Sequence, residues 1–79
     1  MREIYIRRMK PYEARLKLEE ELNRAFMDGI ERVQIVHGIG AGVLRDLTRE
    51  VVGAYDFCDI FETVLSDNPG VTQVDLYPP

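Results

Sequence analysis

The sequence predicts an α/β (α+β) two-layer sandwich, in which two helices cover one face of a four-stranded mixed sheet. Four short segments have the apolar pattern of β-strands, two longer segments have helical spacing, and together they follow the order βαβαββ. A strand, helix and strand in succession form a right-handed crossover, so the first two strands should be parallel. Because two helices cannot easily cover both faces of such a sheet, we expect both on one face, with the other partly open.

The first predicted strand covers residues 2–8 (REIYIRR), where apolar and polar side chains alternate with a period of two. Ile4 and Ile6 point to one face, which we expect to be the core face. Tyr5 and Arg7 point to the other face, which we expect to be the open one.

An amphipathic helix is predicted from Tyr12 to about Met27. Pro11 suits its first turn, where a missing N–H costs nothing, and Gly29 suits the left-handed position after its end. The apolar residues that recur at three- and four-residue steps are Ala14, Leu18, Leu22, Ala25 and Phe26, with Leu16 nearby.

A second strand is predicted over residues 32–37 (RVQIVH), with Gln34 on the open face. A second helix should run from about Gly42 to Val52 and end at Gly53. The expected inner stripe of this helix is Val43, Leu44, Leu47 and Val51.

Two more strands are predicted over residues 57–65 and 71–76, with a turn at 66–70 between them. Cys58 falls in the third strand, where a free cysteine usually behaves as a small buried hydrophobe. As the single cysteine of the chain, it can form neither an internal disulfide nor a Cys-rich zinc site. A reducing cytoplasm is the simplest compartment for such a protein.

The composition predicts one globular domain over residues 1–79, with 46% hydrophobic and 30% charged residues. No apolar run approaches the roughly 18–20 residues that span a bilayer. The N-terminal residues MREIYIRR are charged and lack an apolar signal core, so neither export nor membrane binding is expected.

The net charge of −4 is distributed unevenly along the chain. Residues 1–17 carry six Lys or Arg side chains against two acids, whereas residues 18–79 carry four Arg against twelve acids. A polyanion would therefore be attracted to the N-terminal strand and its surroundings and repelled elsewhere. A solvated surface of mixed charge explains the same pattern equally well.

The segment VQIVHGIGAGVLRD, residues 33–46, joins a strand to a helix through a loop with three glycines. Such a loop lets backbone N–H groups approach a ligand closely, and the helix start adds partial positive charge. His37 lies at the carboxyl end of the strand, where open α/β sheets commonly bind ligands. The spacing is neither that of a dinucleotide fingerprint nor that of a P-loop. On these grounds both a phosphate-contacting loop and a merely tight turn stay open.

Residues 37–45 (HGIGAGVLR) closely resemble the H-G-K-G-x-G-x-L-R signature of Smr (small MutS-related) domains. Residues 4–9 and Glu13-Ala14 are similar to the L-D-L-H/R-G motif and the E-A helix start of that family. The stretch from Gly70 to Thr72 resembles the G-V-T that opens its last strand. The resemblance covers nearly the whole chain. It implies a βαβαββ sandwich similar to the C-terminal domain of bacterial translation initiation factor three.

The same resemblance implies binding of DNA or RNA and an endonuclease activity that nicks DNA or cuts RNA. Matched residue by residue, it suggests His37 and Arg7 as catalytic residues. His37 could act as a general acid or base, and Arg7 could clamp a phosphate through two parallel hydrogen bonds. The nucleic-acid-binding residues would be Tyr5, Arg8, Lys10, Gly38, Gly40, Gly42 and Arg45.

Three departures from the family pattern bear on that activity. Tyr5 stands in place of the Asp of the first motif, which removes a carboxylate. Ile39 replaces the loop Lys, a point charge suited to a phosphate. Arg8 replaces a glycine. The sequence therefore favours nucleic-acid binding with weak or degenerate nuclease activity.

No ligand spacing supports a metal site. A divalent cation would have to recruit scattered carboxylates such as Asp46, Asp56 or Asp59, and with one histidine in the chain a two-histidine relay is impossible. The cofactor requirement is thus open.

Other interpretations remain for the candidate residues. His37 could be a structural hydrogen-bonded residue, Tyr5 a packing residue, and Arg7 and Arg8 a charged sheet surface that discourages edge pairing. The domain could then be a catalytically silent interaction module that pairs with itself or another protein through the open sheet face. A binder of phosphate-bearing small molecules is a third possibility.

Overall fold

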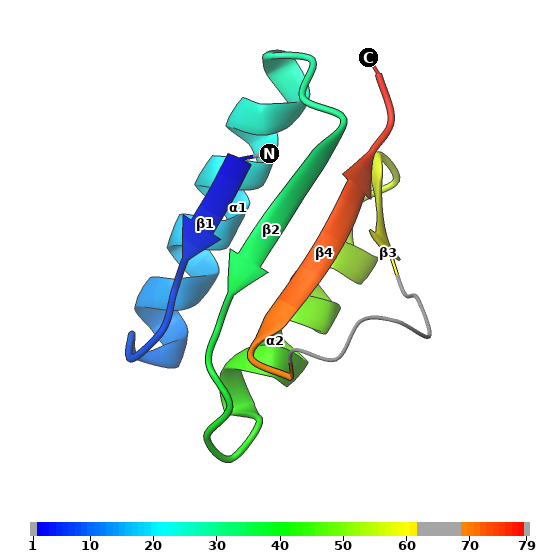
Figure 1. The fold of residues 1–79 in the computed structure, drawn as a ribbon. Coiled ribbons are helices and arrows are strands. Elements are labelled where there is room, and N and C mark those ends of the chain that lie inside the picture. Colours follow the sequence, from blue (N-terminus) through cyan, green and yellow to red (C-terminus); the bar gives the residue numbers. More distant parts are fainter. Residues whose placement is uncertain (1, 62–68, 79) are drawn as a thin grey trace.

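The structure, a computed structural model, describes residues 2–61 and 69–78. Figure 1 shows a four-stranded sheet with both helices behind it, which is the predicted two-layer arrangement. The elements follow the predicted order. They are β1 (Arg2–Tyr5), α1 (Pro11–Met27), β2 (Arg32–Val36), α2 (Val43–Gly53), β3 (Cys58–Phe61) and β4 (Val71–Leu76).

The sheet has the strand order β1-β2-β4-β3. β1 and β2 are parallel, as the crossover rule predicts, with Ile4 opposite Ile35. β4 lies antiparallel between β2 and β3 and completes the mixed sheet. This order brings the carboxyl ends of β1 and β2 to the same edge as the first residue of β4.

The hydrophobic core lies between the sheet and the helices. One side of α1 faces the sheet, and every second residue of the strands faces the helices. The apolar side chains of both therefore pack in a single layer between them. The core residues from α1 are Ala14, Leu18, Leu22 and Ala25, and those from the sheet are Ile4, Ile6, Val33, Ile35, Val74 and Leu76. Each fully buried Leu or Ile contributes roughly 1.5–3 kcal/mol relative to exposure.

The ends of α1 follow the sequence signals. Pro11 is its first residue, and Gly29 adopts a φ of +72° just beyond its end. Leu16 is half exposed, because it lies between the buried positions of the stripe. Phe26 is only partly buried, and its ring stacks on Phe57 with the centroids 4.1 Å apart.

β1 ends at Tyr5, three residues before the predicted end at Arg8. The alternating pattern continues, because Ile6 is still buried and its N–H donates to the Val36 carbonyl. The pairing then stops, since Met9 N–H donates back to the Ile6 carbonyl and Arg8 turns the chain with a φ of +67°. Side-chain periodicity could not reveal this backbone turn.

β2 ends at Val36, one residue before the predicted end. The next two N–H groups, of His37 and Gly38, both donate to the Gly70 carbonyl at 3.0 and 2.9 Å. The base of the glycine loop is thereby attached to the start of β4.

α2 begins and ends one residue later than predicted. Val43 is 56% exposed and does not belong to the inner stripe as expected, because it occupies the first helical position, beside the glycine loop. The buried stripe instead comprises Leu47, Thr48, Val51 and Val52, with Leu44 partly buried. Gly53 is still helical, and Ala54 follows it as the cap.

The third strand is shorter than predicted, with β3 covering Cys58–Phe61. Residues 62–65 of that prediction, and 66–68 of the predicted turn, lie outside the described residues. Cys58 is buried as expected, and this raises the pKa of its thiol to about 11. In the described part of the chain, neither helix is long and apolar enough to cross a membrane.

Candidate nucleic-acid interface

A cavity of about 550 Å³ lies at the edge of the sheet where β1 and β2 end and β4 begins. Three separate segments line it: Arg7 and Arg8 after β1, residues 36–45 from the end of β2 into α2, and Gly70 and Val71 at the start of β4. This cavity is termed the loop cleft below. The two stretches that carry the sequence resemblance therefore lie side by side.

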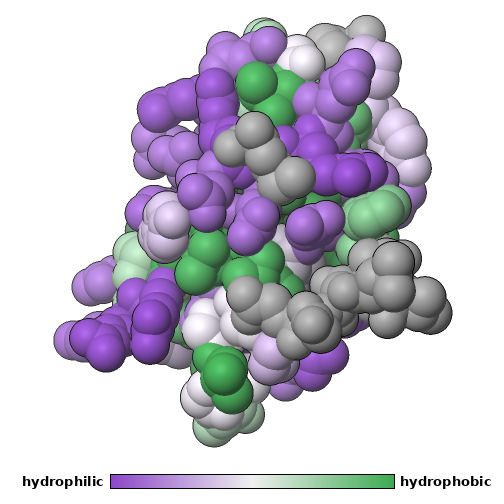
Figure 2. Space-filling view, viewed as in Figure 1, coloured by the Kyte–Doolittle hydropathy of each residue, from purple (hydrophilic) through white to green (hydrophobic). Residues whose placement is uncertain are grey.

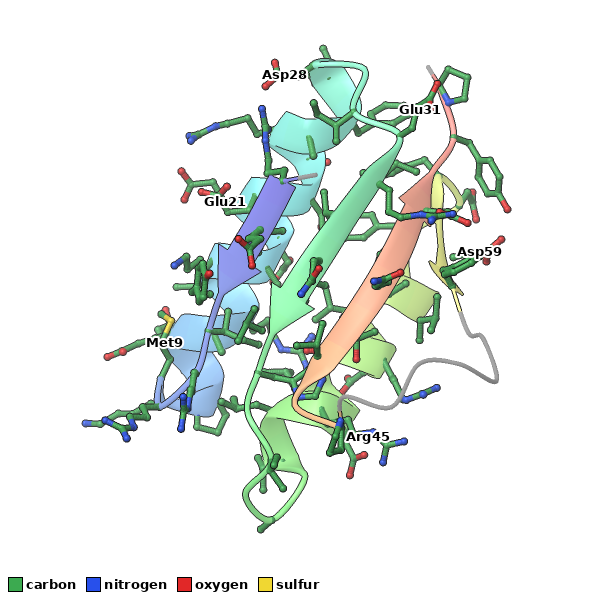
Figure 3. All side chains as sticks on the ribbon, viewed as in Figure 1. Met9, Glu21, Asp28, Glu31, Arg45 and Asp59 are labelled. Atoms are coloured by element: carbon green, nitrogen blue, oxygen red, sulfur yellow. The ribbon has the colours of Figure 1, made fainter. Side chains whose placement is uncertain are left out.

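The figures show the surroundings of this cavity. In Figure 3, Arg45 lies at the lower end of the molecule, beside the loop that leads into α2. In Figure 2, that loop projects as a surface with hydrophobic patches, and strongly hydrophilic atoms lie beside it over the segment that follows β1. The cleft thus combines apolar and charged surface.

Gly38 is required for two reasons. Its φ is +81°, a conformation that L side chains rarely adopt. A Cβ at this position would also lie 3.2 Å from Cγ of Arg7, so the aliphatic stem of Arg7 lies directly against the Gly38 backbone. The absence of a side chain at Gly38 therefore leaves room for the stem of Arg7, which lines the cleft.

Gly40 and Gly42 serve the backbone alone. Their φ angles are +38° and +86°, and a Cβ at either would meet open space. Gly42 is the N-cap of α2 and supplies no side-chain cap. The first turn of the helix consequently has N–H groups without helical partners on the cleft side, where an anion can accept from them.

Arg8 is the one described non-glycine residue with positive φ. The family signature has a glycine here, and the backbone of this chain keeps the glycine conformation while adding an exposed cationic side chain. A left-handed residue costs about 1–2 kcal/mol when it carries a Cβ. The cleft thus gains a charge at the expense of local strain.

His37 lines the loop cleft but is only 4% exposed. Its Nδ1 lies 2.8 Å from the carbonyl oxygen of Gly38, and its Nε2 lies 2.8 Å from Oγ1 of Thr72. A carbonyl only accepts, so Nδ1 carries the proton, and in the neutral ring Nε2 accepts from the Thr72 hydroxyl. Both ring nitrogens are therefore occupied.

Arg45 is exposed on the first turn of α2 and adds a third guanidinium to the cleft. Ile39 and Val43 are exposed by 69% and 56% and form its apolar rim. Among the described residues, none that lines the cleft is acidic. A cavity lined by three cations and by no described carboxylate is suited to an anion.

Two residues assigned to the site from the sequence lie outside the cleft lining. Lys10 is exposed at the N-cap of α1. Tyr5 lies on the open sheet face as predicted, where its hydroxyl donates to the Glu3 carboxylate at 3.1 Å. That bond and the nearby negative charge raise the pKa of Tyr5. Tyr5 is thus engaged with an acid.

The rest of the open sheet face carries polar side chains that bond to one another. Arg32 donates to Asp75 at 2.6 Å and lies 3.9 Å above the ring of Phe61. Tyr77 donates to Asp59, which raises the pKa of this tyrosine.

No three His, Cys, Asp or Glu side chains within residues 2–61 and 69–78 are placed to hold a metal ion.

Comparison with protein families identifies the chain. The model of the Smr domain matches residues 4–76. The chain belongs to the Smr domain family. This match runs from β1 to the end of β4 and includes all three segments that line the loop cleft.

Individual Smr relatives agree with this assignment. "Endonuclease MutS2" of Carboxydothermus hydrogenoformans is 42% identical over 75 residues, which cover 95% of this chain and 10% of that protein. The Smr domain of Thermus thermophilus MutS2 superposes with a TM-score of 0.88 at 28% identity, covering 99% of this chain and all of that one. YdaL, a stand-alone small MutS-related protein from Escherichia coli, has the same fold, with a TM-score of 0.84 at 19% identity over 95% of this chain and 63% of its own. The chain spans about a tenth of the curated relative.

Thr72 is the site residue that sequence reasoning missed. It is buried, and its hydroxyl bonds to the only histidine. The G-V-T match at the start of the last Smr strand contained the signal. Its meaning depends on the antiparallel register of β2 and β4, in which Ile35 lies opposite Thr72.

Proposed function

We propose that this Smr domain binds nucleic acid through the loop cleft. The observation that supports the proposal is the convergence of Arg7, Arg8 and Arg45 on one cavity that no described acid lines, in a chain of net charge −4. Cations gathered in a concave site attract a polyanion to that place. Lys10, which is exposed at the N-cap of α1, is proposed to contribute as a more distant contact.

Each cleft component has a role in binding. Arg7 and Arg45 offer paired N–H donors that match two phosphate oxygens. The N–H groups of the first turn of α2 donate to the same anion, and the left-handed glycines let a phosphate approach them. Tyr5 is proposed as a stacking residue beside the cleft, at the cost of its bond to Glu3.

A titration of fluorescent oligonucleotides at about 50 mM salt tests this proposal. Non-specific binding has a Kd of roughly 10⁻⁴–10⁻⁶ M, so affinity within tens of micromolar is expected. Replacement of Arg45 by Ala should weaken binding and reduce the slope of log K against log salt by about 0.7–0.9. Arg24→Ala is the matched control, because Arg24 is exposed on α1 and paired with Glu20 and Glu21. Absence of binding, or equal losses in both variants, would contradict the proposal.

Weak cleavage of phosphodiester bonds is the second candidate, because His37 and Arg7 line the same cleft. Arg7 would stabilise negative charge that develops on the phosphate. For His37 to take a proton from water, Thr72 would have to turn its hydroxyl away from Nε2. This requirement, together with Tyr5 and Ile39 in place of the family Asp and Lys, argues for low activity.

A nicking assay on DNA and a cleavage assay on RNA, each with His37→Ala and Arg7→Ala, test this second candidate. Activity that falls in both variants, in proteins that still bind nucleic acid, is the expected result. Cleavage that persists undiminished in both would point to a contaminant or to another site. Addition of a chelator in the same assay decides whether a divalent cation takes part.

A further inference from the structure

The loop cleft has an apolar side that phosphate binding does not explain. Ile39 and Val43 are more than half exposed, although exposure of large aliphatic side chains is unfavourable. They lie four residues apart, at the loop and at the first position of α2, and both line the cavity. The Smr signature has a lysine at the position of Ile39, so this chain has exchanged a charge for an apolar surface at the rim.

The size of the cavity restricts what can enter it. About 550 Å³ lies within the range of roughly 300–1,000 Å³ that is usual for pockets of small ligands. One nucleotide fits such a volume, whereas a duplex does not. A paired base could reach the pocket only by leaving its stack, at a cost of a few kcal/mol that an already unpaired base avoids.

The acids of the open sheet face also limit how far a bound nucleic acid can extend beyond the cleft. Away from the three arginines, the open sheet face carries the acids Glu3, Asp59 and Asp75, of which Asp59 and Asp75 lie towards the end of the sheet opposite the cleft. A rigid duplex that extends from the cleft along the sheet would bring further phosphates towards these acids. A flexible single strand can present a few phosphates to the cleft and turn away from the sheet.

We infer that the loop cleft receives an unpaired nucleotide, with the base against Ile39 and Val43 and the phosphate towards the arginines. The inference rests on the proposed function and specifies its substrate class as single-stranded nucleic acid. Ile39 and Val43 are then specificity-determining residues. RNA and DNA share the chemistry that this site recognises, so both are included as arms of the test.

The first experiment uses the wild-type protein and compares three probes at equal salt. These are a short single strand, a duplex with the same number of phosphates, and a single strand with abasic positions. Each probe is used both as RNA and as DNA. The intact single strand should bind at least about tenfold more tightly than the duplex. Loss of the bases should weaken binding about fivefold, the lower end of what one base contact contributes.

The second experiment locates the base contact. Ile39→Ser and Val43→Ser should each weaken binding of the intact strand and leave binding of the abasic strand unchanged. Leu16→Ser is the matched control, since Leu16 is a similarly exposed aliphatic residue on α1 outside the cleft. Ile39→Lys should raise affinity for the duplex and steepen its salt dependence by about one phosphate contact.

The outcomes separate the inference from the proposed function. Equal binding of duplex and single strand, or of intact and abasic strands, would overturn the inference while binding itself stands. Serine variants that lose no more affinity than Leu16→Ser would overturn it as well. Failure of every probe to bind would remove the proposed function, and the inference with it.

Discussion

Two neighbouring surfaces of this Smr domain use their charges differently. On the open face of the sheet, Arg32 is paired with Asp75 and covers Phe61, while Tyr77 is bonded to Asp59. In the loop cleft, three arginines converge, and no described residue that lines it is acidic. The open face is net acidic, because Glu3 and Asp59 are bonded to uncharged tyrosines, whereas the cleft lining is net cationic.

This difference favours the proposal of nucleic-acid binding over the interaction-module hypothesis. A partner that docks on the open face must either break the bonds within it or match a surface that is net acidic. The charge of a polyanion complements that of the cleft lining. The following variants test this contrast between the open face and the cleft.

The largest expected effect concerns the buried support of the cleft. Thr72→Val removes the hydroxyl that bonds Nε2 of His37 and leaves a buried ring nitrogen without a partner. The free energy of unfolding should fall by roughly 1–3 kcal/mol, measured by urea denaturation. Thr48→Val is the matched control: this buried threonine bonds the Leu44 carbonyl within α2, and its loss should cost under about 1 kcal/mol. Equal losses in the two variants would mean that the histidine bond is unimportant.

A second variant tests the contact between Gly38 and Arg7. Gly38→Ala and Gly40→Ala both place a Cβ on a left-handed backbone, so each should lower stability by about 1–2 kcal/mol. Only the alanine at 38 would press on the stem of Arg7. We expect it to weaken oligonucleotide binding several-fold more than the alanine at 40 does. Identical affinities would show that this contact does not position Arg7 for binding.

A pair of arginine variants compares the two surfaces directly. Arg45→Ala should weaken binding several-fold at low salt, because it removes a cleft cation that forms no ion pair with a described residue. Arg32→Ala removes a cation that is already neutralised by Asp75, so binding should change little. Fluorescence anisotropy at two salt concentrations measures both. A larger loss for Arg32→Ala would assign nucleic-acid binding to the open face instead.

Arg8→Gly separates backbone strain from charge. The variant relieves a positive φ of +67° and should raise the free energy of unfolding by about 0.5–1 kcal/mol. The same change removes a cation, so binding should weaken although the protein becomes more stable. Arg8→Ala, which keeps the strain, is the control. If both variants have the same stability, the left-handed turn is not strained.

The smallest expected effect is a pH dependence on the open face. Each of Tyr5 and Tyr77 donates to a carboxylate, which raises the pKa of its phenol above the ordinary value of 10. The folded state therefore holds these protons more tightly than the unfolded state, so this contribution to stability is complete below about pH 10 and is lost as pH rises through the raised pKa. Glu3→Gln should move part of the absorbance titration at 295 nm to lower pH. An unchanged curve would exclude the bond to Tyr5.

Much of the fold was predictable because packing decides it. The buried stripe of α1 and the alternation in β2 and β4 repeat over enough residues to identify each element, and the crossover rule then fixed the parallel pair. The predictions were wrong where backbone conformation, rather than the side-chain pattern, determines where an element ends or which residues are buried. Arg8 ends β1 through its left-handed conformation, and Val43 is exposed because the glycine loop precedes it.

The candidate site was predictable only in part. The motif resemblance identified His37, Arg7 and the loop glycines, and the structure places them around one cavity. The bond from Thr72 to His37 could not be foreseen, because it depends on the pairing of two strands 35 residues apart in the chain. The catalytic and binding roles of these residues stay predictions until the variants are measured.

The attachment of the glycine loop has a consequence for its motion. Because the N–H groups of His37 and Gly38 share the Gly70 carbonyl, the base of the loop is fixed to the central strand β4. Any change of loop conformation on binding nucleic acid should therefore occur in residues 39–42, because residues 37 and 38 are held by these hydrogen bonds. Amide hydrogen exchange should be slow at residues 37 and 38 and fast at residues 39–42. A bound ligand should slow exchange at residues 39–42 and leave it unchanged at 37 and 38.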